Sequence, residues 1–203
     1  MFEAVSEPNS LLVGDAYDFL AGINLKESNY DSAIINFLKA IEIFKLNKSN
    51  NNLRLANCYT GLGILFRKTN NLVKALEYQK LALTKIEESN KSNSLKIQVY
   101  NNLGTLYLDL EEISKAKYYL EESISMNESS INIDQSTLGN SYNSLAMVYV
   151  LTEEYKKALN AVSNALNIFQ NDQEMSLESF QLEVDLMKVK IALEQKILEE
   201  EKK

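Results

Sequence analysis

Tyr100-Asn-Asn-Leu-Gly-Thr-Leu-Tyr107 is the stretch that decides the fold, because its central pattern recurs along the chain. The pattern is a tyrosine, two further residues, a leucine and then glycine or alanine, and its four copies begin at Tyr17, Tyr59, Tyr100 and Tyr142. An alanine lies sixteen residues after each of these tyrosines, at Ala33, Ala75, Ala116 and Ala158. The tyrosines are 42, 41 and 42 residues apart. A register this constant predicts stacked repeats that do not share one closed core.

Each repeat has the pattern of two helices packed closely together. With about 3.6 residues per turn, one stripe of the first helix in the third repeat carries Tyr100, Leu103, Gly104 and Tyr107. A second helix follows, and its inner stripe carries Ala116, Leu120 and Ser123. Small residues let the two backbones approach, while tyrosine and leucine fill the flanking space. Because the 203 residues include only one proline and six glycines, the sequence predicts an all-α chain of helical hairpins.

The hairpins are expected at about residues 10–47, 52–90, 94–128 and 135–171, within a repeat domain that spans 10–173. Residues 1–9 are expected to form an N-terminal tail. From each alanine to the next tyrosine the spacing is 26, 25 and 26 residues, whereas the spacing inside each hairpin is constant. The variable length therefore falls in the polar loops between hairpins.

The last segment, residues 174–203, has no breaker and carries two apolar stripes on nearly opposite sides of one helix. One stripe contains Leu177, Phe180, Val184, Met187, Ile191 and Leu198, and the other contains Leu182, Leu186, Val189, Leu193 and Ile197. One of them is expected to cap the fourth hairpin, because the end of a repeat array needs a closing element. The other stripe is left for a partner, for a second copy in a homodimer, or for the continuation of a longer chain.

Composition argues against catalysis and against nucleic-acid binding. The 21 basic and 28 acidic residues give a net charge of −7, the wrong sign for gripping phosphates over a wide surface. The chain has no histidine, the commonest general base and metal ligand, and it lacks a glycine-rich phosphate loop. Neighbouring glutamates such as Glu111 and Glu112 are interpreted as solvated faces. We therefore expect no enzyme activity, no catalytic residues, no metal site and no cofactor.

The sequence also favours a cytoplasmic protein. Cys58 is the only cysteine, which rules out an intramolecular disulfide and indicates a reducing compartment, and it is interpreted as a small core residue. Residues 1–10 lack the basic and apolar regions of a signal peptide, and no apolar run is long enough to span a bilayer.

The repeat resembles the tetratricopeptide repeat over residues from about 14 to 170. That family places a large residue, leucine, a small residue and an aromatic on its first helix and alanines on its second, as the third repeat does here. Departures are Asn24 for the aromatic, Ser123 for the last alanine, and the absence of the closing proline. The long period resembles the kinesin light chain and Pins-type branch. The resemblance implies an all-α, right-handed α-solenoid of four hairpins plus a C-terminal capping helix.

In that family the side of the first helix that lies opposite the tyrosine and leucine stripe lines a concave groove that binds peptides. The resemblance therefore implies a set of groove residues. They are Asn57, Thr60, Ile64, Arg67 and Lys68 in the second repeat, Gln98, Asn101, Asn102 and Thr105 in the third, and Asn140, Asn143 and Met147 in the fourth. Amides suit this role because they donate to and accept from a peptide backbone. The alternative is that these residues are only exposed polar positions in an asparagine-rich chain.

Two functions remain open at this point. The first is a non-enzymatic scaffold that binds an extended peptide of a protein partner in the groove. Asp15 and Asp18, with Arg67 and Lys68 on the next helix, suggest a ligand of mixed charge. The second is a self-associating or regulatory module of a signalling protein that acts through its C-terminal helix. Neither function involves nucleic acid or membrane insertion.

Overall fold

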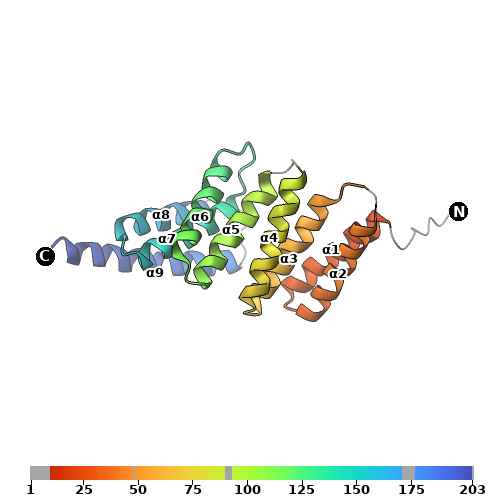
Figure 1. The fold of residues 1–203 in the computed structure, drawn as a ribbon. Coiled ribbons are helices and arrows are strands. Elements are labelled where there is room, and N and C mark those ends of the chain that lie inside the picture. The colour runs from red at the N-terminus through yellow and green to blue at the C-terminus, as the bar shows by residue number, and fades with distance from the viewer. Residues whose placement is uncertain (1–9, 48, 90–92, 171–176, 203) are drawn as a thin grey trace. The chain divides into compact units, whose positions relative to one another are not determined.

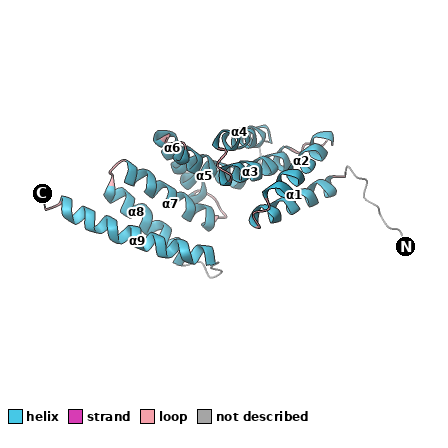
Figure 2. Cartoon of the chain, turned by 90° about the horizontal axis from the view of Figure 1, so that it is seen from below, coloured by secondary structure: helices cyan, strands magenta, loops and turns pink. Residues whose placement is uncertain are grey.

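The computed structural model describes residues 10–47, 49–89, 93–170 and 177–202, except for the side chains of 93, 177–184 and 200. Within these residues every regular element is an α-helix (Figures 1 and 2). The chain forms two compact units, residues 1–99 and 100–203, and each is described by itself. The predicted all-α fold class, an α-solenoid of helical hairpins with a closing helix, is confirmed.

The first unit contains two complete hairpins. They consist of α1 (Leu11–Lys26) with α2 (Tyr30–Leu46) and of α3 (Asn52–Lys68) with α4 (Leu72–Ser89). The two helices of each hairpin pack along their length, and α3 also packs against α1 and α2. The unit ends with the first residues of α5 (Asn93–Asp109). The expected tail, residues 1–9, lies outside the described residues.

The second unit contains the rest of α5 and four further helices. These are α6 (Ile113–Glu128), α7 (Gln135–Leu151), α8 (Tyr155–Gln170) and α9 (Leu177–Glu200). Helix α7 packs on both α6 and α8, and α9 packs on α8. The start of α7 is capped by Asp134, whose carboxylate accepts from the backbone N–H of Thr137 at 3.0 Å. The residues 174–176, with which the predicted last segment begins, are not described.

The turn inside each hairpin has the same backbone conformation four times. Its middle residue lies in the left-handed region, with φ between 58° and 60°, at Ser28, Asn70, Glu111 and Glu153. The next backbone N–H then bonds back to the carbonyl five residues earlier, as from Asn71 to Phe66 at 2.7 Å and from Glu154 to Tyr149 at 2.8 Å. This closing bond ends the first helix and fixes where the second begins. None of the four residues is glycine, so each carries a backbone strain of about 1 kcal/mol.

Small residues form the contact between the two helices of a hairpin. The four alanines of the repeat are completely buried, and Leu62 and Leu103 beside them are equally inaccessible. A Cβ atom built on Gly104 of α5 would lie 2.5 Å from Cγ of Leu120 on α6. The helices therefore meet at a distance that only glycine allows at this position. The signature residues Leu62, Leu103, Leu145 and Ala146 are core residues, as the sequence predicts.

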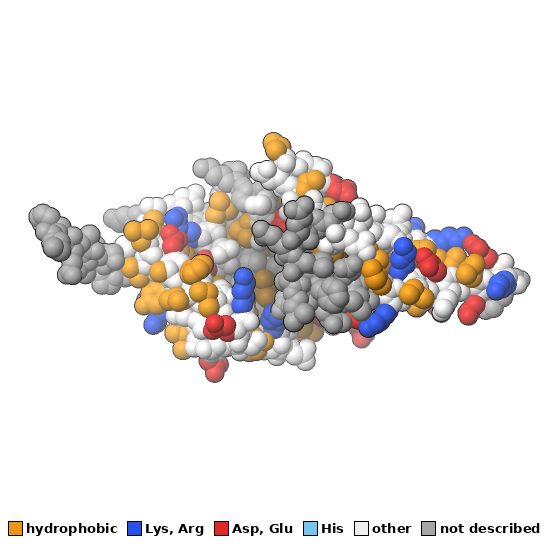
Figure 3. Space-filling view, turned by 180° about the vertical axis from the view of Figure 1, so that it is seen from behind, with side chains coloured by type: hydrophobic (Ala, Val, Ile, Leu, Met, Phe, Trp, Pro, Cys, Tyr) orange, Lys and Arg blue, Asp and Glu red, His pale blue; other side chains and the backbone are white. Residues whose placement is uncertain are grey.

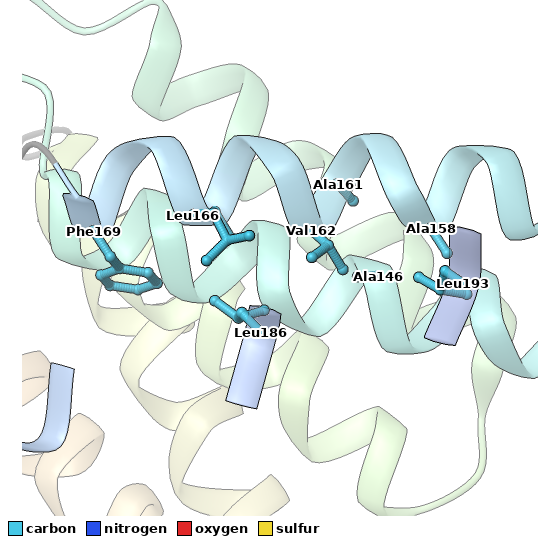
Figure 4. Packing of buried hydrophobic residues seen from close by; sticks show 9 residues of the cluster. Ala146, Ala158, Ala161, Val162, Leu166, Phe169, Leu186 and Leu193 are labelled. Atoms are coloured by element: carbon cyan, nitrogen blue, oxygen red, sulfur yellow. The ribbon is translucent and has the colours of Figure 1, made fainter. Parts of the chain in front are cut away.

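Helix α9 caps the fourth hairpin with one side of its surface. Leu186 and Leu193 are buried in a cluster with residues of α8 such as Val162 and Leu166, and Figure 4 shows both leucines directed toward that helix. On the other side, Met187, Ile191 and Leu198 stay exposed, and Figure 3 shows apolar side chains between charged ones at this end of the chain.

The predicted division of the two stripes is wrong at one residue. Val189 belongs to the same stripe as Leu186 and Leu193 but is 41% exposed, because it lies on the flank of the buried face, about 60° from Leu186 and about 40° from Leu193 around the helix. Leu177, Phe180, Leu182 and Val184 belong to the undescribed side chains.

Replacing Gly104 by alanine should destabilise the chain by about 1–2 kcal/mol, because overpacking against Leu120 outweighs the better helix propensity of alanine. The matched control is Gly22→Ala on α1, where an added Cβ meets nothing within 4 Å. That change should raise the free energy of unfolding by up to about 1 kcal/mol. Urea titrations of the two variants measure both effects, and equal shifts of the two midpoints would contradict the packing argument.

Candidate functional site

Polar side chains of α1 and α3, the first helices of the first two hairpins, meet on the side opposite the tyrosine and leucine stripe. Arg54 donates to both oxygens of Asp15, at 2.7 Å from Nε and 3.2 Å from Nη2. One turn further along, Nδ2 of Asn57 donates to Asp18 at 2.7 Å. The charged pair is open to solvent and contributes about 1 kcal/mol or less, but its two-pronged geometry fixes the relative orientation of the side chains.

Cys58 and Asp18 form the buried end of this network. The Sγ of Cys58 donates to Asp18 at 3.2 Å, and the cysteine is fully inaccessible. Burial, reinforced by the charge of Asp18, raises the pKa of the Cys58 thiol far above its ordinary value. Burial also raises the pKa of the Asp18 carboxyl, although the hydrogen bonds from Cys58 and Asn57 act in the opposite direction. The interpretation of Cys58 as a core residue is confirmed, and its thiol stays protonated.

A hollow of about 410 Å³ opens beside this network on the first unit. Helices α1, α3 and the start of α5 line it with Asp18, Leu53, Arg54, Asn57, Ser94, Leu95 and Gln98. Two of the predicted groove residues, Asn57 and Gln98, are thus brought together. One N–H of the Asn57 amide is bonded to Asp18, so its second N–H and its carbonyl oxygen are what it offers to a ligand.

The other predicted residues of the second repeat do not line the hollow. Thr60 is buried, and its hydroxyl donates to the carbonyl of Ala56 at 2.8 Å, so its prediction as a groove contact is wrong. The reason is that Thr60 lies on the side of α3 that packs against α4, where its backbone carbonyl accepts a hydrogen bond from the side chain of Gln79. Ile64 is half-buried, while Arg67 and Lys68 are exposed at the end of α3.

In the second unit the predicted residues lie on α5 and α7. Asn101, Asn102, Thr105, Asn140 and Asn143 are half-buried. Met147 is 55% exposed. The side-chain oxygen of Asn101 accepts from the hydroxyl of Ser141 at 3.0 Å, so it is part of the contact between α5 and α7.

The charges near α1 have internal partners. Arg54 and Asn57 bind Asp15 and Asp18, which the sequence had assigned, with Arg67 and Lys68, to a ligand of mixed charge. Arg54 was not among the predicted site residues, although its position five residues before Tyr59, next to the acidic face of the preceding repeat, was a usable signal. The carboxylates of α1 are therefore first of all structural.

The described residues offer neither a metal-binding cluster nor a membrane-spanning helix. No group of three acidic or cysteine side chains that could hold a metal occurs among them. Likewise, no helix in the part of the chain that the structure describes is long and apolar enough to cross a membrane.

Comparison with protein families gives one match that covers most of the chain. The model of the tetratricopeptide repeat matches residues 12–88 and again 95–171. Each match contains two of the four hairpins. No curated protein matches.

Several solved structures share the fold at low sequence identity. BtubC (BKLC) from P. vanneervenii has a TM-score of 0.70 and 20% identity, and the match covers 95% of this chain and 79% of that one. The apo form of RapI has a TM-score of 0.74 and 16% identity, with 92% and 64% covered. The Cut9–Hcn1 hetero-tetramer of APC/C has a TM-score of 0.66 and 16% identity, with 85% and 29% covered. The chain thus spans less than two thirds of the latter two proteins.

The raised pKa of Asp18 predicts a pH dependence of stability. A carboxyl whose pKa is higher in the folded state binds its proton before the unfolded chain does, so folding gains stability as the pH falls through the folded pKa. This stability is fully present below the unfolded pKa and is lost as the pH rises through the folded pKa. An Asp18→Asn variant lacks the gain. Urea titrations between about pH 7 and about pH 4 should show wild type gaining on the variant as the pH falls. A constant difference over this range would contradict the assignment.

Proposed function

Because the chain belongs to the tetratricopeptide repeat family, we propose that it is a non-enzymatic scaffold that binds an extended peptide segment of a protein partner along its first helices. The observation that carries the proposal is the hollow on α1, α3 and the start of α5, where Asn57 and Gln98 occupy the same register position in consecutive repeats. A ligand that follows this register meets one amide per repeat.

The chemistry of the hollow suits a peptide backbone. An extended segment presents one donor and one acceptor per residue, and amide side chains can pair with both. Leu53 and Leu95 add apolar surface beside the amides. In the second unit, Asn140 has the same register position as Gln98, and Met147 offers an exposed apolar anchor. We extend the proposed contact surface to these residues.

The proposed partner is a protein, not a nucleic acid, since the net charge of −7 opposes phosphate binding. One solved structure of similar fold is the APC/C hetero-tetramer Cut9–Hcn1, which is in line with a role in assembly. The proposed location is the cytoplasm, where the buried thiol of Cys58 would stay reduced.

A double change tests the groove. Peptides that bind the wild-type chain are first selected from a random library of extended segments. Their affinity should then fall about 30-fold in Gln98→Ala with Asn143→Ala, because each lost hydrogen bond contributes about 1 kcal/mol. Isothermal titration measures the affinity, and the melting temperature should stay nearly unchanged because neither side chain is fully buried.

The control removes a polar side chain outside the proposed surface. Thr84 is exposed on α4, the second helix of its hairpin, and Thr84→Ala should leave the affinity unchanged. Unaltered binding in the double variant, or an equal loss in the control, would refute the groove.

The exposed side of α9 favours a second candidate function, self-association. Met187, Ile191 and Leu198 lie within about 40° of one another around the helix, and the last two are 56% and 55% exposed. The proposed homodimer through residues 174–203 would bury this stripe, whose short length makes the pairing weak.

Light scattering on Ile191→Glu tests this candidate. If α9 mediates a dimer, the variant should be a monomer at concentrations where wild type is dimeric, because the new charge would be buried without a partner. Ala192→Glu adds the same charge to an exposed position about 100° further around the helix and should stay dimeric. A wild-type chain that is monomeric at all concentrations would exclude the dimer.

A further inference from the structure

Three aromatic rings pack together in the second repeat. Phe66 of α3 and Tyr78 of α4 are stacked, with centroids 5.4 Å apart and planes 6° from parallel. Tyr59 lies seven residues, or about two helical turns, before Phe66 on α3, and its ring centroid is 6.1 Å from that of Tyr78. The ring from the second helix therefore sits between two rings of the first helix, and Tyr59 is buried while Phe66 and Tyr78 are half-buried.

The third repeat contains the same arrangement. Tyr119 of α6 stacks on Tyr107 at 5.5 Å and 12°, and it meets Tyr100 edge-on at 5.4 Å. Tyr119 is three residues after the repeat alanine, as Tyr78 is in the second repeat. Stacked and edge-on pairs at these distances are favourable beyond the area they bury.

The fourth repeat keeps the two outer rings but lacks the middle one. Tyr142 and Tyr149 stand at the outer positions, whereas Ala161 of α8, labelled in Figure 4, replaces the middle tyrosine. A hollow of about 410 Å³ is found there, and Tyr142, Tyr149, Lys157 and Ala161 are among the residues that line it. It lies within the second unit and shares no residue with the hollow on α1 and α3.

The two tyrosines of this hollow are held in place from α6. The hydroxyl of Tyr142 donates to Glu128 at 2.5 Å, and that of Tyr149 donates to Glu121 at 3.3 Å. Burial and the bond to Glu128 raise the pKa of Tyr142 to about 12, so it remains a donor at neutral pH. The rings are thus preorganised, which lowers the entropic cost of binding between them.

A lysine beside the hollow is compatible with a stacked ring. The ammonium of Lys157 lies 5.6 Å from the centroid of Tyr149. Lys74 and Lys115 have the same register position and lie 5.1 and 5.2 Å from Phe66 and Tyr107, which nevertheless stack on Tyr78 and Tyr119. In the sister repeats such a cation and a third ring thus share the outer ring, and at Tyr149 a second cation, Lys117 of α6, lies 5.2 Å from the centroid.

We propose that this hollow is a binding site for an aromatic side chain of a protein partner, which would insert between Tyr142 and Tyr149 in the place that Tyr78 and Tyr119 take in the sister repeats. The repeats themselves show which chemical group fits, since the same backbone position carries a tyrosine twice. The site is separate from the proposed peptide groove and does not depend on it.

The full chain is titrated with N-acetyl-L-tyrosinamide while the ring resonances of Tyr142 and Tyr149 are followed by NMR. We expect saturable shifts in the millimolar range and an affinity roughly three- to tenfold higher than that of N-acetyl-L-leucinamide. Ala161 is buried in the cluster of α8 and α9, beneath this hollow. In a folded Ala161→Tyr variant the tyrosine should fill the hollow and abolish the shifts, since Tyr78 and Tyr119 occupy the same position in the sister repeats. Gln98→Ala should not change them, which separates this site from the groove.

A second variant tests the same idea without filling the hollow. Tyr119→Ala opens the equivalent position in the third repeat, so new saturable shifts should appear at Tyr100 and Tyr107. No saturable shift in wild type, equal affinity for the leucine compound, or binding that survives a folded Ala161→Tyr variant would each overturn the proposal. Should Ala161→Tyr fail to fold, the absence of new shifts in Tyr119→Ala would overturn it.

Discussion

The close approach of two helices at small residues is the constraint on which each hairpin depends. Ala116 is completely buried, and one turn later Leu120 lies where a side chain on Gly104 would have to be. A larger residue at either helix would separate the pair and remove the buried surface on which the stability of the hairpin rests. Since every repeat uses the same register, the constraint also fixes which face of each first helix is turned away from its own hairpin.

That remaining face of the first helices has two parts. Part of it joins neighbouring repeats, as Asp15 with Arg54 and Asn101 with Ser141 show. The rest is exposed to solvent, as at Gln98 and Met147. Polar side chains on the first helices are therefore not a uniform row of ligand contacts. The proposed groove uses residues of both parts, since Asn57 is bonded to Asp18 of the preceding repeat and still lines the hollow.

Register alone was enough to predict the helices. The four tyrosine copies and their alanines indicate all eight hairpin helices, because burial of a stripe repeats with the sequence. The strained turn residues gave no such signal, since Ser28 and Glu153 occupy positions where glycine is the usual marker. They are held there by the closing hydrogen bond and by the packed helices on either side, which are tertiary effects.

The candidate site was less predictable for a related reason. Thr60 and Asn57 are both polar residues on one helix, yet Thr60 is buried and bonded to its own backbone while Asn57 is exposed beside Asp18. Which of the two faces solvent depends on the rotation of α3 against α1 and α4, and periodicity gives this rotation only to within about one residue, or about 100°. Side-chain pairing across repeats, such as Arg54 with Asp15, lies beyond a pattern that compares each repeat only with itself.

Burial at a given register position depends on the neighbouring hairpin as well as on the residue. Leu62 and Leu103 are inaccessible, but Leu20, at the same position in the first repeat, is 46% exposed, and Phe19 beside it is exposed too. In the inner repeat the position of Phe19 is Gly61, on which a Cβ would meet the ring of Phe37 from the preceding hairpin. No described hairpin precedes α1, so its apolar residues lack the contact that buries their counterparts.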